Sequence, residues 1–156
     1  MKEKTTVLIA DDNQEFSRTL ASYIQEQPDL EVIGIAKDGE EAIDMITNIE
    51  PDIALLDVIM PHLDGIGVLE KINMIKTDKK PICIMLSAVG QDKITQKAIM
   101  LGAEYYVVKP FDIELLIKRI KELKNFKPTQ NQNSFIDREV RTQYVEIPQN
   151  GENNIE

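Results

Sequence analysis

Apolar residues along the chain follow two kinds of spacing that alternate regularly. Short runs of apolar and β-branched residues are typical of strands, and longer stretches with an apolar residue every three or four positions are typical of helices. Five short runs predict β-strands at 6–10, 31–36, 53–56, 82–86 and 105–108. All four residues of the third run are apolar, which favours a strand buried on both faces of a parallel sheet.

Each predicted strand is followed by a stretch with helical spacing, the first at about 14–27 and the last starting near Asp112. Asn13 can cap the first helix, Pro28 follows its predicted end, and Gly102 ends the fourth. We expect these residues to form the buried faces of the five helices: Phe16, Leu20, Tyr23 and Ile24; Ala42, Ile43, Ile46 and Ile49; Ile66, Leu69, Ile72 and Ile75; Ile94, Ala98 and Leu101; Ile113, Leu116, Ile117, Ile120 and Leu123.

Five strand–helix units in regular alternation predict an α/β fold, a doubly wound five-stranded parallel sheet with helices on both faces. From Asn125 onward, Asn and Gln dominate and no apolar period persists. We therefore expect one domain over 1–124 and a flexible linker or tail over 125–156. A linker in this position suggests that an effector domain lies beyond Glu156, outside this sequence.

Composition and charge narrow the function classes. The hydrophobic content of 42% is sufficient for a core, and the formal net charge of −9 argues against nucleic-acid binding by this chain. No signal-peptide pattern or membrane-spanning apolar run is present, so we expect a cytoplasmic protein without membrane contact. Cys83, the single cysteine, is expected to be a small buried side chain, and His62, the single histidine, an exposed loop residue.

Polar residues follow four of the predicted strands at the point where each strand ends. Asp11 and Asp12 follow the first strand, Asp57 the third, Ser87 the fourth and Lys109 the fifth. Because the carboxyl ends of parallel strands share one edge of the sheet, these five side chains are expected to converge.

The chemistry of this set favours phosphoryl transfer. Three carboxylates in close proximity repel one another, and a divalent cation relieves that repulsion. Oxygen ligands suit Mg²⁺, which Ca²⁺ or Mn²⁺ can replace. Lys109 offers a positive charge and Ser87 a hydroxyl donor to phosphate oxygens, so Asp57 can act as the nucleophile that forms an acyl phosphate.

Each residue also has a simpler interpretation. The pair Asp11 and Asp12 is favourable at any helix N-terminus, because the helix dipole attracts negative charge there. Asp57 alone can be a helix cap, Ser87 alone a turn residue, and Lys109 alone a solvated surface residue. Their joint placement at four strand ends is what favours the functional interpretation.

Taken together, these motifs resemble the receiver domains of two-component response regulators over about residues 5–124. The resemblance rests on the acidic pair at 11–12, Asp57, Ser87-Ala88 and Lys109-Pro110-Phe111. Three stretches, 10–13, 59–65 and 102–106, resemble more narrowly the receivers of sporulation regulators from endospore-forming Firmicutes.

The resemblance implies a flavodoxin-like sheet of the receiver type and a role for each site residue. Asp57 matches the phospho-acceptor, and Asp12, Asp57 and the backbone carbonyl of Ile59 match the metal ligands, with Asp11 completing the acidic pocket. Ser87 and Lys109 match the switch hydroxyl and the lysine of the family. Tyr106 matches an aromatic switch residue that turns inward after phosphorylation, and the Lys109–Pro110 bond matches one that is usually cis.

The resemblance also implies partners. They are a sensor histidine kinase or phosphotransferase as phosphoryl donor, a phosphatase, and a second copy of the chain, with which it dimerises on phosphorylation. DNA contact would come through the domain absent from this sequence, a transcription factor for sporulation genes. The chain itself is expected to catalyse only its own phosphorylation and slow dephosphorylation, rather than to act as an enzyme.

Three alternatives are weighed against this interpretation. A dinucleotide-binding dehydrogenase needs a glycine-rich loop after the first strand, where this chain has Asp11 and Asp12. A Mg²⁺-dependent aspartyl phosphatase of the haloacid dehalogenase type usually carries an acid two residues after its nucleophile, where this chain has Ile59. A pure interaction module would have a degenerate site.

Ile59 and Val89 are both apolar and give a water nucleophile no hydrogen bond, which predicts a long-lived acyl phosphate.

Overall fold

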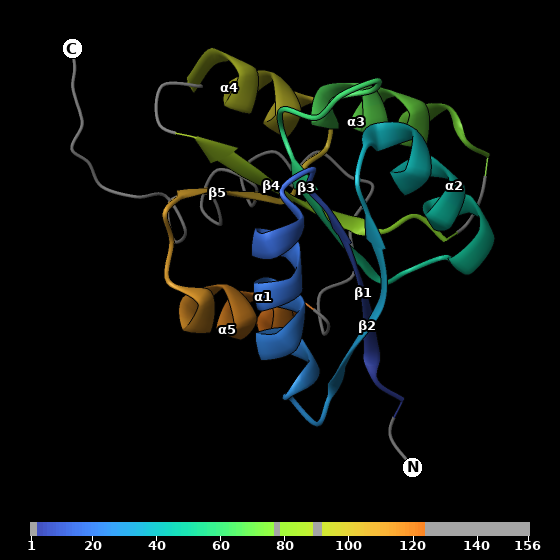
Figure 1. The fold of residues 1–156 in the computed structure, drawn as a ribbon. Helices are drawn as coiled ribbons and strands as arrows, with labels where there is room; N and C mark the ends of the chain where they lie inside the picture. The colour runs from blue at the N-terminus through green and yellow to red at the C-terminus, as the bar shows by residue number, and fades with distance from the viewer. Residues whose placement is uncertain (1–2, 77–78, 89–91, 124–156) are drawn as a thin grey trace.

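The computed structural model describes residues 3–76, 79–88 and 92–123 of the chain. Strands and helices alternate throughout this part (Figure 1). The elements are β1 (Thr5–Ala10), α1 (Gln14–Gln25), β2 (Leu30–Ala36), α2 (Gly39–Ile49), β3 (Ile53–Asp57), α3 (Gly65–Met74), β4 (Ile82–Ala88), α4 (Asp92–Met100), β5 (Tyr105–Lys109) and α5 (Ile113–Leu123). Among these described helices, none is both long and apolar enough to cross a membrane.

All strand pairs of the sheet are parallel, and the strand order is β2-β1-β3-β4-β5. This arrangement confirms the predicted doubly wound α/β fold. Strand β3 lies at the centre and β5 at one edge. The register places Asp57 beside Leu86 and Ala88 beside Lys109, so the carboxyl ends of β3, β4 and β5 lie at the same edge of the sheet.

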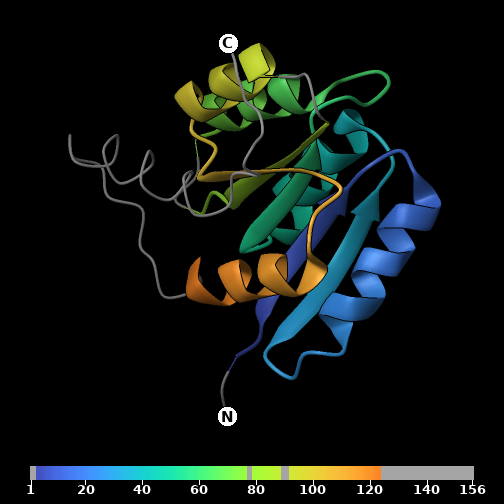
Figure 2. The same ribbon diagram turned by 90° about the vertical axis from the view of Figure 1, so that its left-hand side faces the viewer.

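Helices cover both faces of the sheet (Figures 1 and 2). Helices α1 and α5 lie on one face, and α2, α3 and α4 lie on the other. Successive residues of β3 point to opposite faces: Ile53 and Leu55 pack with the α1 and α5 side chains, and Ala54 and Leu56 with those of α2 and α3. All four are fully buried, as predicted from the unbroken apolar run.

Several predicted boundaries are wrong by one or two residues. Helix α1 ends at Gln25 rather than Gln27, because the amide of Gln27 donates to the carbonyl of Ile24 at 3.0 Å, three residues back, in a tighter turn than the helix. Strands β4 and β5 continue through Ser87 and Lys109, where paired sheet hydrogen bonds outweigh the polarity of the side chains. The cap by Asn13 is confirmed, since its Oδ1 accepts from the amide of Phe16 at 3.0 Å.

Three residues predicted to be buried are exposed. Tyr23 is 47% exposed, Ile49 45% and Ile94 38%. Each lies at the flank or end of its apolar stripe; in α4, for example, Thr95 and Ala98 are buried in place of Ile94. The predicted tail at 125–156 and the residue Val89 lie outside the described residues.

Candidate functional site at the carboxyl ends of the strands

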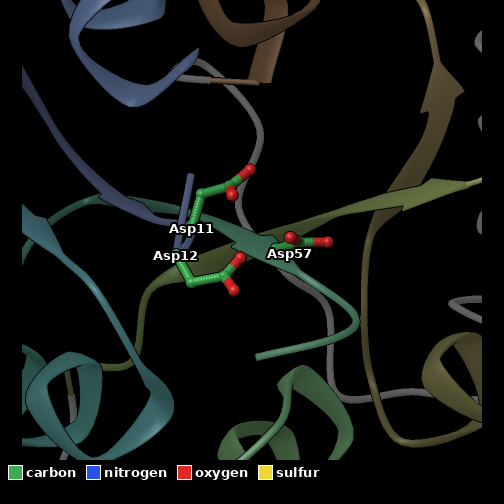
Figure 3. A group of neighbouring side chains, drawn as sticks. All are labelled: Asp11, Asp12 and Asp57. Carbon is green, nitrogen blue, oxygen red and sulfur yellow. The ribbon is translucent and has the colours of Figure 1, made fainter. Parts of the chain in front are cut away.

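Three carboxylates meet at the carboxyl ends of β1 and β3, as the strand-end argument predicts (Figure 3). One oxygen from each of Asp11, Asp12 and Asp57 lies within 4.8 Å of the others. Asp11 is buried, Asp12 is exposed, and the side chain of Asp57 is 13% exposed. The cluster therefore has a buried base and an open side toward solvent.

Asp11 is held at both carboxylate oxygens. Its Oδ1 accepts a hydrogen bond from the backbone amide of Asn13 at 2.9 Å, and its Oδ2 accepts from Lys109 Nζ at 2.8 Å. A buried carboxylate needs such partners, because burial removes the water that would stabilise its charge. Asp11 is thus a fixed part of the site.

Lys109 stands at the end of β5, between two of the carboxylates. Its Nζ lies 3.6 Å from Asp57 Oδ2, in addition to the shorter contact with Asp11. Among the described residues it is the one cation paired with this cluster. One ammonium cannot balance three ionised carboxylates, so the site retains negative charge.

Asp57 has an unusual proton affinity as a result. Burial raises the pKa of its carboxyl to about 6, and the negative charge of Asp11 contributes in the same direction. The positive charge of Lys109 and the backbone amide of Ile59, 3.5 Å from Asp57 Oδ1, lower this pKa and only partly offset the rise. The carboxylate of Asp57 is therefore more basic than that of an ordinary aspartate.

The residues present fit a divalent cation. Three carboxylates with uncompensated charge offer only hard oxygen donors, which Mg²⁺ prefers over nitrogen or sulfur. The open side of the cluster leaves room for the waters that Mg²⁺ retains. Ile59 is the fourth predicted metal ligand and the one expected to bind through its backbone carbonyl. It follows Asp57 by two positions and is 51% exposed.

Ser87 lies on the neighbouring strand β4, one residue beyond the partner of Asp57 in the register. Its side chain is only 1% exposed, and among the described residues its Oγ has no hydrogen-bond partner. An unsatisfied buried hydroxyl costs about 1–3 kcal/mol. A group that arrives near this hydroxyl with free acceptor oxygens would remove that cost.

Tyr106, the predicted aromatic switch, lies beside Met85 in the β4–β5 register. Its ring is partly buried and packs against the core formed on the α2, α3 and α4 side of the sheet. The Lys109–Pro110 peptide bond is cis, as the resemblance implied.

Sequence reasoning assigned Phe16 and Gly65 no part in the site. Lys109 Nζ lies over the ring of Phe16, 4.5 Å from its centroid, and Phe16 meets Phe111 edge to face at 5.9 Å. A Cβ on Gly65 would lie 2.5 Å from the backbone oxygen of Asp57, so only glycine fits there. Spacing gives no signal for either contact, although Phe111 belongs to the motif that carried the resemblance.

The single cysteine and the single histidine lie where the sequence predicted them, one buried and one exposed. Cys83 is buried, and burial raises the pKa of its thiol to about 12. His62 is exposed in the loop after β3 with a positive φ of 68°.

Comparison with known proteins identifies the family. The response regulator receiver domain family matches residues 7–121. The receiver domain of the Francisella response regulator 1452 is 30% identical, covers 80% of this chain and 100% of its own, and has a TM-score of 0.70. The response regulator domain of Thermotoga maritima CheB is 30% identical, covers 81% of this chain and 100% of its own, and has a TM-score of 0.73. The signal receiver domain of NarL from Mycobacterium tuberculosis is 25% identical, with the same coverages and a TM-score of 0.74. The chain therefore belongs to the family of response regulator receiver domains.

Proposed function

We propose that this receiver accepts a phosphoryl group on Asp57 from the phosphohistidine of a sensor histidine kinase or phosphotransferase. The observation that carries the proposal is the position of Asp57 in the acidic cluster, with Lys109 Nζ 3.6 Å from its carboxylate. The hydroxyl of Ser87 on the adjoining strand, which has no hydrogen-bond partner in the described part of the chain, supports it.

In the proposed reaction an oxygen of Asp57 attacks phosphorus, and the bond between phosphorus and the histidine nitrogen breaks. The product is an acyl phosphate on Asp57. Lys109, which donates to Asp11 and lies 3.6 Å from Asp57, then donates hydrogen bonds to the phosphoryl oxygens, and the hydroxyl of Ser87 donates a hydrogen bond to one of them. A Mg²⁺ held by Asp11, Asp12, Asp57 and the carbonyl of Ile59 would supply positive charge to the same oxygens, a role that Ca²⁺ or Mn²⁺ can share.

Phosphorylation would switch the packing beside β4. When Ser87 moves toward the phosphoryl group, it vacates space that the partly buried ring of Tyr106 can enter. The surface formed by α4, β5 and α5 changes with it, because Tyr106 lies on β5. We propose that a second copy of the chain binds this surface after phosphorylation, so that a local change in charge shifts a two-state equilibrium.

We further propose a role in the control of sporulation. The stretches 10–13, 59–65 and 102–106 resemble the receiver of stage zero sporulation protein A, and 125–156 would link the receiver to a DNA-binding domain that acts as a transcription factor. The net charge of −9 agrees with DNA contact through that domain rather than through this chain. Asp57→Asn in the complete regulator should abolish heat-resistant spores in the source organism; normal spore counts would contradict this part of the proposal.

We propose that the chain promotes only its own phosphorylation and slow dephosphorylation. The apolar side chain of Ile59 stands where an aspartyl phosphatase usually carries its second acid, and it can neither donate a proton to a leaving group nor accept one from an attacking water. Rapid reset of the signal then requires a separate phosphatase. Steady release of phosphate from a small aryl phosphate would contradict this view.

Intact-mass measurement after incubation with acetyl phosphate and Mg²⁺ tests the central proposal. The parent should gain the mass of one phosphoryl group, Asp57→Asn should gain none, and Asp44→Asn should match the parent because Asp44 is an exposed residue on α2. A gain in Asp57→Asn would mean that another side chain is the acceptor. No gain in the parent would contradict the proposed function.

A further inference from the structure

The ammonium of Lys109 has a third neighbour besides the two carboxylates, the aromatic ring of Phe16. We infer that Phe16 is a positioning residue: its ring face holds the Lys109 ammonium beside Asp57 and thereby speeds phosphorylation of Asp57. The inference rests on the proposed function and deepens it. Its geometric basis is the 4.5 Å between Lys109 Nζ and the ring centroid, within the range of a cation–π contact.

The fold fixes the ring at this place from two directions. Phe16 lies in the first turn of α1, where its backbone amide donates to Asn13 Oδ1 at 3.0 Å. Its side chain is partly buried against the core of α1 and α5, and Phe111 packs against it with the ring planes 87° apart. The edge-to-face arrangement restrains both rings. Phe16 therefore presents a stable surface to a flexible lysine.

An aromatic face differs from a carboxylate as a partner for this lysine. The contact with Asp11 at 2.8 Å draws the ammonium away from Asp57, whose oxygen is 3.6 Å distant. The ring attracts the cation without claiming a directed N–H bond or adding a negative charge. Lys109 thus stays near Asp57 with donors available for phosphoryl oxygens, and less side-chain entropy is lost when those oxygens arrive.

A purely structural role for Phe16 would be to fill space next to Phe111. The two roles differ in what they require of the ring. Core filling requires apolar volume, whereas the positioning role requires the negative electrostatic potential of the ring face. Fluorination of the ring weakens that potential with little change in shape, and leucine removes the ring but keeps an apolar side chain.

The experiment measures the rate of phosphorylation by acetyl phosphate with Mg²⁺ for the parent and its variants. Phe16→Leu should slow the reaction about threefold, the size expected from loss of a partly exposed cation–π contact. Phe16→Tyr should restore most of the rate, and successive fluorination of Phe16 should lower it stepwise. Tyr23→Leu, an exposed aromatic residue on the same helix, is the matched control and should match the parent.

Two further measurements separate positioning from structure. In a Lys109→Met background, Phe16→Leu should cause no additional slowing, because the cation is gone. In metal-free protein, the ring current of Phe16 should shift the NMR signals of the Lys109 methylene next to Nζ upfield, and Phe16→Leu should abolish that shift while Phe16→Tyr keeps it. Thermal unfolding of each variant checks that it is folded. If Phe16→Leu does not fold, the fluorinated variants still test the positioning role.

The outcomes are distinguishable. Equal rates for the parent and the fluorinated variants, or the same slowing by Phe16→Leu in the Lys109→Met background, would overturn the positioning role and leave the proposed function intact. Absence of any phosphorylation of the parent would overturn both.

Discussion

Asp11 and Lys109 lie 98 positions apart in the sequence and form an ion pair of 2.8 Å, with the carboxylate fully buried. Asp11 directly follows β1 and Lys109 ends β5, so the pair links the first and last strands in chain order. A carboxylate this deeply buried depends on the positive charge of its partner, because burial removes the water that would otherwise stabilise its negative charge.

Removal of the lysine should therefore destabilise the protein. We expect Lys109→Met to lower the free energy of unfolding by about 1–2 kcal/mol at neutral pH, less than for a fully buried pair because Lys109 is 29% exposed. Urea unfolding in metal-free buffer measures this. Lys37→Met breaks an exposed pair with Glu41 on α2 and should change the value by less than about 0.5 kcal/mol. Equal effects of the two substitutions would contradict the dependence of Asp11 on Lys109.

The carboxyl group of Asp57 predicts a pH dependence of stability. Burial and the charge of Asp11 raise its pKa to about 6 in the folded protein, above the value of about 4 in an unfolded chain. The folded state therefore binds this proton more tightly, so its contribution to stability is complete below about pH 4 and is lost as the pH rises through about 6.

Asp57→Asn isolates this contribution, because it removes the titrating group and keeps the shape. In metal-free buffer the variant should be more stable than the parent at pH 7.5, by on the order of 1 kcal/mol, and the difference should shrink toward pH 4. Chemical unfolding across this pH range measures it. A parent more stable than Asp57→Asn at pH 7.5 would contradict the raised pKa.

Addition of Mg²⁺ should reverse part of the electrostatic cost of the acidic cluster. Ligand binding at ten times its dissociation constant stabilises a protein by about 1.4 kcal/mol. We expect Mg²⁺ to raise the Tm of the parent, and EDTA to cancel the rise. Asp12→Asn should lose most of this effect, and Asp44→Asn should keep it. Equal Mg²⁺ effects in both variants would place the cation elsewhere.

The apolar side chain of Ile59 predicts slow loss of the phosphoryl group. It stands two residues after Asp57, is 51% exposed, and offers no hydrogen bond to an attacking water. We expect Ile59→Asn to shorten the half-life of the acyl phosphate severalfold, as followed by intact mass after removal of acetyl phosphate. Ile59→Val keeps the apolar character and serves as control. A half-life of seconds in the parent would show that this position does not protect the bond.

The sequence was sufficient for the fold and for the cluster of acids because both depend on strand ends. The unbroken apolar run of β3 predicts a central strand, and in a parallel sheet Asp57 and Asp11 must then share an edge. The helical pattern was less informative about burial. Periodicity identifies a helix, but it does not show how much of the helix circumference is covered by the sheet. Tyr23 and Ile94 lie at the flank of their stripes and are exposed for that reason.

Contacts between side chains of elements far apart in the chain could not be predicted from the sequence. The ring of Phe16 meets Lys109 only because α1 crosses the sheet at a particular height and angle, and the sequence pattern of α1 does not encode either. The same holds for Gly65, whose missing side chain lets α3 begin against the backbone of Asp57.

The strand order limits how far a signal must travel. Only β4 separates β3, which carries Asp57, from the edge strand β5, and neighbouring strands lie about 5 Å apart, so the distance from the strand of Asp57 to that edge is about 10 Å. Over so short a distance, a structural change at Asp57 would reach the edge without passing through the rest of the domain. Under the proposed function, substitutions of exposed residues at this edge alone would change which partner binds there, while the acidic cluster at the centre of the sheet stays the same.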